Sequence, residues 1–212
     1  MIKAHHTTLG QWFWAQFSKW SIKLRFHTFR IEKTVKADPQ RPMLLIGNHI
    51  SWWDGFWPLW LNRKYFRKRF HVMMLEEELK KRRFMRQGGA FSIHPNKRSM
   101  LESLDYVNEL LKDADNLVVI YPQGKIHSMS DHRIRFEKGL ERILTVCGEE
   151  TQVVFSVVLV DYFARARPTV FYYLGEWEGI SNKEQGFLIE EVEEAYNRFY
   201  RLCLAEHRRR KV

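Results

Sequence analysis

The chain has 212 residues, enough for one α/β domain with a full hydrophobic core, and its 35 Lys and Arg outnumber its 25 Asp and Glu, which gives a net charge of +10. Its two cysteines, Cys147 and Cys203, lie far apart, and no His, Cys or Asp cluster has metal-ligand spacing, so the sequence predicts no disulfide framework and no metal site. No apolar stretch reaches the roughly 20 residues that a bilayer-spanning helix needs, and none resembles the core of a signal peptide.

The first predicted element is an amphipathic helix within residues 8–30. Its apolar residues, many of them aromatic, are interspersed with Lys19, Lys23, Arg25 and Arg30. Tryptophans beside outward-reaching lysines are typical of a helix that lies in a membrane interface. A helix packed wholly on the rest of the protein is the alternative. We therefore divide the chain into a membrane-associating segment, residues 1–35, and an α/β domain, residues 36–212.

The next elements are a buried strand and a helix joined by a turn that carries His49. The apolar run 43–47 ends in a glycine and predicts the strand, and residues 55–62 predict the start of the helix, with Ser51 or Asp54 near its N-terminus. On one continuous helix, positions five apart would point roughly 140° apart. A strand-to-helix turn can instead fold Asp54 onto His49. The carboxylate would then hold one ring nitrogen, and the other could take a proton from a hydroxyl group.

The rest of the chain alternates strands with helices. Strands are predicted at residues 70–75, 90–93, 117–121, 152–160 and 169–174, and helices at 76–86, 97–112, 136–147 and 184–207. This order predicts the α/β class, with a mostly parallel sheet flanked by helices. The loops after strands 43–47 and 117–121 would open at the same carboxyl edge of the sheet, where ligands usually bind.

Ten of the 35 Lys and Arg residues lie in two short runs, residues 63–69 and 80–86, which interleave basic with aromatic or apolar residues. Such runs suit an anionic membrane surface, or the phosphates of coenzyme A or an acidic carrier protein. A non-enzymatic basic module that binds nucleic acid is a second class of function with this charge. The chain contains no nucleic-acid-binding motif, so we expect no nucleic-acid partner.

Three segments resemble, in the same order, signature blocks of the glycerolipid acyltransferases, the superfamily that contains the lysophosphatidate acyltransferases. They are Asn48–Asp54, Gly88–Ile93 and Val118–Gly124, and two weaker matches follow at Phe136–Gly139 and Val153–Val158. The resemblance implies the fold of that superfamily. It also implies a fatty acyl transfer from acyl-CoA or acyl carrier protein to a hydroxyl of a lysophospholipid or other lipid, without a further cofactor.

In this family reading, His49 is the general base and Asp54 orients it. The protein would work on the cytoplasmic face of a membrane as a peripheral or monotopic enzyme. The resemblance implies substrate contact by Asn48 and Ser51 in the first block, by Gln123 in the third, and by Lys125 directly after it.

Gly124, in the third block, is expected to let backbone N–H groups approach the oxyanion that forms during acyl transfer. An ordinary turn glycine after Pro122 is the alternative reading of this position.

The chain departs from the family pattern in the second and third blocks. The family usually has Glu where this chain has Gln123. It commonly has Arg, as part of the site for the acceptor's phosphate, where this chain has His94, which is followed by Lys97 and Arg98. A lysine cannot copy the bidentate phosphate contact of an arginine. A non-phosphate acceptor, such as a glycolipid or aminolipid, is therefore an alternative, as is a lipid-binding protein of this fold without turnover.

Overall fold

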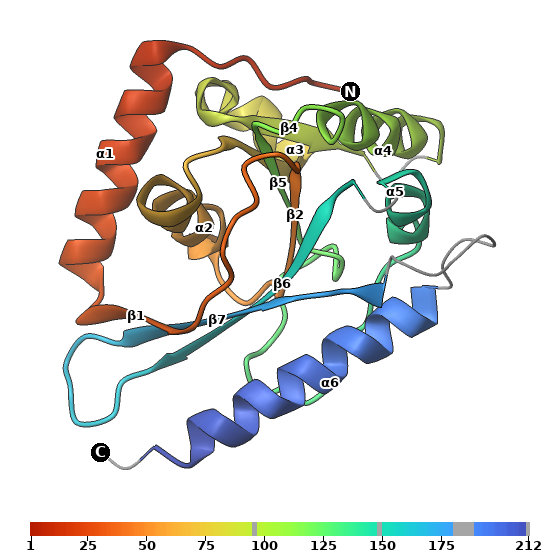
Figure 1. Ribbon diagram of the computed structural model, residues 1–212. Helices are drawn as coiled ribbons and strands as arrows, with labels where there is room; N and C mark the ends of the chain where they lie inside the picture. The colour runs from red at the N-terminus through yellow and green to blue at the C-terminus, as the bar shows by residue number, and fades with distance from the viewer. Residues whose placement is uncertain (95–96, 148–149, 180–188, 211–212) are drawn as a thin grey trace.

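The computed structural model describes residues 1–94, 97–147, 150–179 and 189–210, in which seven strands form one sheet between two layers of helices (Figure 1). Along the chain the strands are β1 (Thr28–Lys33), β2 (Met43–Gly47), β3 (Arg69–Leu75), β4 (Ala90–Ile93), β5 (Asn116–Ile120), β6 (Gln152–Asp161) and β7 (Thr169–Glu176). Across the sheet their order is β1-β7-β6-β2-β5-β3-β4.

The sheet is mostly parallel, as the sequence predicts. Of the strand pairs in the described residues, β6 and β7 run antiparallel and the others run parallel. β2 lies between β5 and β6, and all five of its residues are buried. Strands covered on both faces read as continuous apolar runs, which is why Met43–Gly47 is apolar throughout. The carboxyl ends of β2 and β5 meet at one edge, so the loops that follow them are neighbours.

Helices cover both faces of the sheet. They are α1 (Thr8–Arg25), α2 (Trp57–Leu61), α3 (Glu76–Lys81), α4 (Lys97–Leu110), α5 (Leu140–Cys147) and α6 (Ile189–Arg208). Leu44 and Ile46 pack in a core with α4, α5 and α6, whereas Met43 and Leu45 pack in a core with α1, α2 and α3. The alternation along β2 follows from the two-residue period of a strand.

The helix α1 packs on the domain with one face and leaves the other exposed. Thr7 caps its first turn through a bond from the N–H of Gly10 to the hydroxyl oxygen. The buried face includes Trp14, Ser18 and Ile22, while large apolar side chains lie exposed on the other face: Leu9, Trp12, Phe13, Trp20 and Leu24. Among the described residues, none of the helices is both long and apolar enough to cross a bilayer.

The segment after α1 differs from the prediction. The helix ends at Arg25, and Thr28–Lys33 forms the edge strand β1, which pairs in parallel with β7. Exposed and half-buried residues alternate irregularly along β1, so the sequence gives no clear strand pattern there. The proposed boundary at residue 35 therefore separates β1 from the sheet that it joins, although membrane association of residues 1–35 stays a prediction.

Three predicted helices have different bounds. Where one helix is predicted at 55–62, the chain forms the short 3-10 turn η1 (Trp52–Gly55), then α2, then the π-helical turn η2 (Asn62–Phe66). Where one helix is predicted at 76–86, α3 is followed by a second 3-10 turn, η3 (Arg83–Gly88). The helix predicted at 136–147 begins instead at Leu140, as α5, because Gly139 has a φ of +121°. Residues 184–188 of the last predicted helix lie outside the described residues.

Candidate active site

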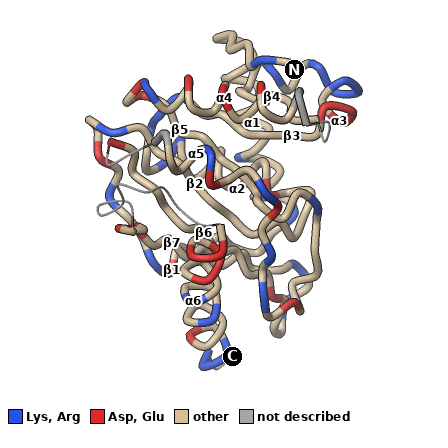
Figure 2. The backbone as a smooth tube through the Cα atoms, turned by 90° about the vertical axis from the view of Figure 1, so that its right-hand side faces the viewer, with Lys and Arg blue, Asp and Glu red and all other residues tan. Residues whose placement is uncertain are grey.

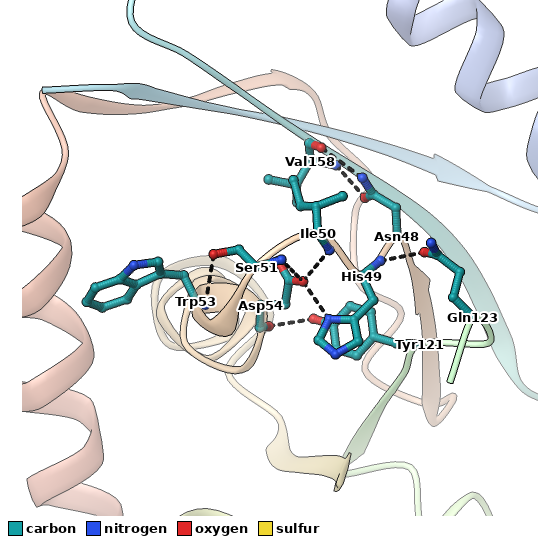
Figure 3. A network of polar contacts seen from close by, with 9 residues as sticks. All are labelled: Asn48, His49, Ile50, Ser51, Trp53, Asp54, Tyr121, Gln123 and Val158. Atoms are coloured by element: carbon teal, nitrogen blue, oxygen red, sulfur yellow. Dashed lines mark hydrogen bonds and ion pairs between the residues drawn. The ribbon is translucent and has the colours of Figure 1, made fainter. Parts of the chain in front are cut away.

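The turn that carries His49 is fixed at the end of β2 by Asn48. The side-chain amide of Asn48 donates to the carbonyl oxygen of Val158 over 2.9 Å, and its Oδ1 accepts from the N–H of Val158 over 2.8 Å (Figure 3). The residue is 1% exposed. Its predicted role as a substrate ligand is therefore replaced by a structural one, because both polar atoms of the side chain tie the turn to β6.

Ser51 is the N-cap of the next turn, η1. Its Oγ accepts from the N–H of Trp53 over 3.2 Å, and its own N–H donates to Asp54 Oδ2 over 2.9 Å, a reciprocal cap on η1. This confirms the predicted place of Ser51 at the start of a helical turn. Ser51 thus supports the site through these two bonds, and substrate contact by its hydroxyl stays a prediction.

The cap brings Asp54 onto His49. Asp54 Oδ2 lies 2.7 Å from His49 Nδ1 and also accepts from the N–H of Ile50 over 2.7 Å. The Asp54 side chain is 2% exposed, whereas that of His49 is 25% exposed. A carboxylate at Nδ1 assigns the ring proton to that nitrogen and leaves Nε2 as the proton acceptor. The turn predicted from the sequence therefore produces a general-base geometry.

The buried carboxylate of Asp54 is electrostatically costly. Burial raises the pKa of Asp54, whereas the hydrogen bond from His49 and the backbone N–H groups of Ser51 and Ile50 lower it. Within the described structure, its second oxygen, Oδ1, is buried and has no hydrogen-bond partner. A positive charge on the His49 ring would offset part of this cost, because it would lie 2.7 Å from Asp54 Oδ2.

The loop after β5 holds the backbone of His49 from both sides. Gln123 Oε1 accepts from the N–H of His49 over 2.6 Å, and the N–H of His127 donates to the carbonyl oxygen of His49 over 2.9 Å. Gln123 is 3% exposed. A glutamine presents the same acceptor oxygen to this N–H as a glutamate would, so the departure from the family pattern removes a charge without removing the bond.

The structure supports the turn-glycine interpretation of Gly124, whereas an oxyanion site formed by the neighbouring backbone N–H groups stays a prediction. Its N–H donates to the carbonyl oxygen of Tyr121 over 3.1 Å, and its φ is +69°. It is therefore a turn glycine, and its N–H is not available to an oxyanion in this conformation. The next residue, Lys125, is exposed and stays a candidate for contact with substrate.

Tyr121 is a site residue that the sequence did not identify. It directly follows β5, and its ring stacks on the ring of His49 with centroids 4.9 Å apart and planes 24° apart (Figure 3). The signal that was available is the aromatic residue immediately before Pro122, Gln123 and Gly124.

The residues predicted to replace the family's arginine follow β4, the outermost strand at one end of the sheet. His94 directly follows β4, an outer strand that is three strand spacings from β2, or roughly 14 Å at about 4.8 Å per spacing. Lys97 and Arg98 are the first residues of α4, and their side chains lie outside the described structure. The sheet therefore does not bring His94 next to His49.

The second block requires glycine at position 89 because of a close backbone approach. Gly89 has a φ of +106°, and a Cβ at this position would lie 1.9 Å from the carbonyl oxygen of Phe70. Only glycine allows β3 and β4 to approach in this way. In the part of the chain that the structure describes, no three His, Cys, Asp or Glu side chains are grouped to hold a metal ion.

Comparison with known proteins gives a match to a family model and similarity to solved structures. A family model described as Acyltransferase matches residues 28–160, more than half of the chain. The fold is similar to the crystal structure of the 1-acyl-sn-glycerophosphate (LPA) acyltransferase, PlsC, from Thermotoga maritima, with a TM-score of 0.67 and 16% sequence identity over 95% of this chain and 81% of that chain. No curated protein matches the sequence.

Proposed function

This chain belongs to the Acyltransferase family, and from that premise we propose that it transfers a fatty acyl group from an acyl thioester to a hydroxyl group of a lysophospholipid or related lipid. The observation that carries the proposal is the His49–Asp54 pair at the carboxyl end of β2, with Nδ1 held by a buried carboxylate. Acyl-CoA or acyl carrier protein would supply the thioester, and no other cofactor is required.

The proposed reaction is a single acyl transfer. His49 Nε2 takes the proton of the acceptor hydroxyl while its oxygen attacks the thioester carbonyl carbon. The carbon–sulfur bond of the tetrahedral intermediate then breaks, and the imidazolium returns its proton to the departing thiolate. Asp54 stabilises the imidazolium between the two steps, and no serine or cysteine nucleophile takes part.

The surroundings of His49 support a lipid substrate. The two loops beside it carry large exposed apolar side chains, Trp52 after β2 and Ile126 and Met129 after β5. Such residues at the mouth of a site suit fatty chains better than a fully hydrated substrate. Lys125, exposed on the same loop, is our candidate for the cation that meets the acceptor's phosphate or the developing oxyanion.

The test is transfer of labelled acyl groups from acyl-CoA, and separately from acyl carrier protein, to a panel of lysophospholipids and glycolipids. We expect His49→Ala to lower kcat by at least about 10³-fold, within the range for loss of a general base. His27→Ala is the matched control, because His27 is exposed between α1 and β1. Full turnover by a folded His49→Ala variant would rule out this mechanism.

We also propose that the exposed face of α1 lies on a membrane surface. Lys19 and Lys23 sit over the ring of Trp20, at 5.8 and 5.3 Å from its centroid. An aromatic ring flanked by lysines suits the headgroup region of a bilayer. In contrast, α6 carries acidic residues in its first turns and mainly basic residues further along, and such a charged surface is typical of a water-facing helix (Figure 2).

At least four charges of the basic runs have partners within the protein. In the second run, Lys80 pairs with Glu76, and both Lys81 and Arg82 pair with Glu78. In the first, Lys68 donates to three backbone carbonyls, those of Asp38, Arg41 and Ala114, and burial lowers its pKa. Because these four charges already contact groups of the protein, we favour α1 over the basic runs as the membrane-contacting surface. They do not favour a nucleic-acid partner either.

Leu24 and Leu202 allow a matched test of membrane binding. Both are exposed leucines on helices, 67% on α1 and 62% on α6. Burial of one leucine contributes about 1.5–3 kcal/mol, so Leu24→Ser should weaken binding to mixed phosphatidylcholine and phosphatidylglycerol vesicles by about tenfold or more. Leu202→Ser should leave vesicle binding unchanged. Equal effects of the two variants would remove α1 as the docking face.

A further inference from the structure

Tyr121 contacts both members of the His49–Asp54 pair. Its ring stacks on the imidazole of His49, with centroids 4.9 Å apart and planes 24° apart. Its hydroxyl donates to the backbone carbonyl oxygen of Asp54 over 2.5 Å. One side chain from the loop after β5 therefore touches the ring of the base and the turn that carries its carboxylate partner (Figure 3).

The end of β2 is shaped to admit this ring. A Cβ at Gly47 would lie 2.8 Å from Cε1 of Tyr121 and 2.9 Å from Oγ of Ser156. Real Cβ atoms do not approach other atoms so closely, so a side chain at position 47 would displace the tyrosine. The glycine that ends the strand and the tyrosine that stacks on the base therefore form one arrangement.

The stacking has a consequence for proton transfer. When His49 takes a proton, its ring becomes a cation that lies parallel to the face of Tyr121. The face of an aromatic ring carries negative electrostatic potential, so it attracts a cation more than a neutral ring. The contact therefore favours the protonated form of His49, which is the form present between the two steps of the proposed reaction.

Tyr121 itself does not exchange protons in this arrangement. Burial raises the pKa of its phenol well above the ordinary value of 10, and the charge of Asp54 raises it further. The hydroxyl thus stays protonated and remains a donor to the Asp54 carbonyl across the physiological pH range.

We propose that Tyr121 is a positioning residue, whose ring fixes the plane of the His49 imidazole and stabilises its protonated form, and whose hydroxyl holds the turn that carries Asp54. This inference rests on the proposed function of His49 as the base. The ring and the hydroxyl have separate roles in this proposal. Substitutions can remove the hydroxyl alone or the whole aromatic ring.

The first measurement is a titration of the His49 imidazole by NMR in the intact protein, which does not depend on turnover. Tyr121→Leu removes the aromatic face and should move the His49 titration to lower pH, because the protonated form loses its partner. Tyr121→Phe keeps the face and should leave the titration within error of wild type. An unchanged titration in folded Tyr121→Leu would overturn the proposal.

A second variant keeps the test decisive if Tyr121→Leu does not fold. Pentafluorophenylalanine at position 121 retains the shape of the ring but reverses the charge of its face. It should move the His49 titration to lower pH relative to Tyr121→Phe. Equal titrations of these two proteins would also overturn the proposal.

The second measurement is the pH dependence of kcat/KM, whose acid limb reports the base of the free enzyme. Tyr121→Leu should lower kcat about 10- to 100-fold with little change in KM and shift the acid limb to lower pH. Tyr121→Phe should lower kcat about 3- to 10-fold without that shift. A wild-type acid limb and kcat in Tyr121→Leu would contradict the inference.

Tyr200→Phe is the matched control for the hydroxyl. The hydroxyl of Tyr200 donates to the backbone carbonyl of Asp131 over 3.0 Å, so this variant loses the same type of bond beside a different aspartate. Its kcat should stay within about twofold of wild type. If wild-type protein shows no acyl transfer but the His49 titration shifts as expected, the proposed function fails while the stacking interaction stands.

Discussion

Two His–Asp pairs lie in the loops at the same edge of the sheet, and they differ in the distance between the partners and in their exposure to solvent. His49 Nδ1 and Asp54 Oδ2 are 2.7 Å apart, and the Asp54 side chain is 2% exposed. His127 Nδ1 and Asp131 Oδ2 are 3.3 Å apart, with the two side chains 34% and 44% exposed. The first carboxylate accepts two backbone N–H groups in addition to the imidazole, so its position does not depend on the histidine.

This difference teaches what makes such a pair useful. A carboxylate held by backbone N–H groups out of water keeps its place while the charge on the histidine changes. An exposed pair can separate into solvent, and water screens its attraction. Sequence spacing does not distinguish the two pairs, since the residues lie five apart in one pair and four apart in the other. The turn after β2, which is fixed by hydrogen bonds, distinguishes them.

Asp54→Asn tests directly whether the charge of the buried carboxylate makes the first pair different from the second. An amide with its oxygen in the place of Oδ2 keeps the three hydrogen bonds but cannot stabilise an imidazolium by charge. We expect kcat to fall by about 10²- to 10⁴-fold, the range of general acid–base catalysis, with a smaller change in KM. Steady-state acyl transfer measures this. A loss below tenfold would mean that the charge of Asp54 is not used.

Substitutions of Gln123 test whether activity requires the hydrogen bond to the backbone N–H of His49. In Gln123→Ala the N–H of His49 loses its acceptor, and a buried unpaired N–H costs about 1–3 kcal/mol. We expect a lower unfolding midpoint in urea and a loss of about 10- to 100-fold in kcat. Gln123→Glu restores the acceptor oxygen and should recover most of both quantities. If Gln123→Glu were as impaired as Gln123→Ala, the bond to His49 would not be the reason for the effect.

The pH dependence of stability sharpens the comparison further. Because burial raises the pKa of Asp54 in the fold above its unfolded value of about 3.9, the folded state binds more protons than the unfolded state between these two values. The contribution of Asp54 to the free energy of unfolding therefore falls as pH rises through this window and is constant above it. Asp54→Asn lacks this contribution.

The measurement is urea unfolding at a series of pH values. The stability of Asp54→Asn relative to wild type should increase as pH rises from about 4 and then level off. Asp54→Asn should thus gain stability relative to wild type between about pH 4 and neutral pH, although its kcat stays low. A relative stability that decreases over the same range would contradict the sign of the Asp54 shift.

The sequence predicted the fold well where periodicity reports burial. β2 and β5 are buried on both faces and read as apolar runs, and the turn between β2 and α2 followed from the glycine, the serine and the aspartate near it. β1 was missed because its residues are only partly buried and give no period. Its place in the sheet is decided by pairing with β7, a contact distant in sequence.

The sequence predicted the contact between His49 and Asp54, but it did not predict the residues that hold this pair in place. The approach of Asp54 to His49 follows from local turn chemistry, which sequence spacing reports. The contacts of Tyr121 and His127 with His49 join residues more than 70 positions apart, and no local pattern encodes them. Asn48 shows the same limit, since its bonds to Val158 turn a predicted ligand into an anchor.

Asp131→Asn should have the smallest effect of the changes considered. The carboxylate is 44% exposed and lies 3.3 Å from His127, and an exposed pair of this kind contributes about 0.2–1 kcal/mol. The bond that His127 gives to His49 comes from its backbone N–H, which the substitution leaves in place. We therefore expect kcat/KM and the unfolding midpoint to stay close to wild type, with a difference of at most about twofold in kcat/KM at low and high salt alike. A loss similar to that of Asp54→Asn would mean that an exposed carboxylate can serve the site as well as a buried one, and the fixed turn after β2 would no longer explain why one pair is the base.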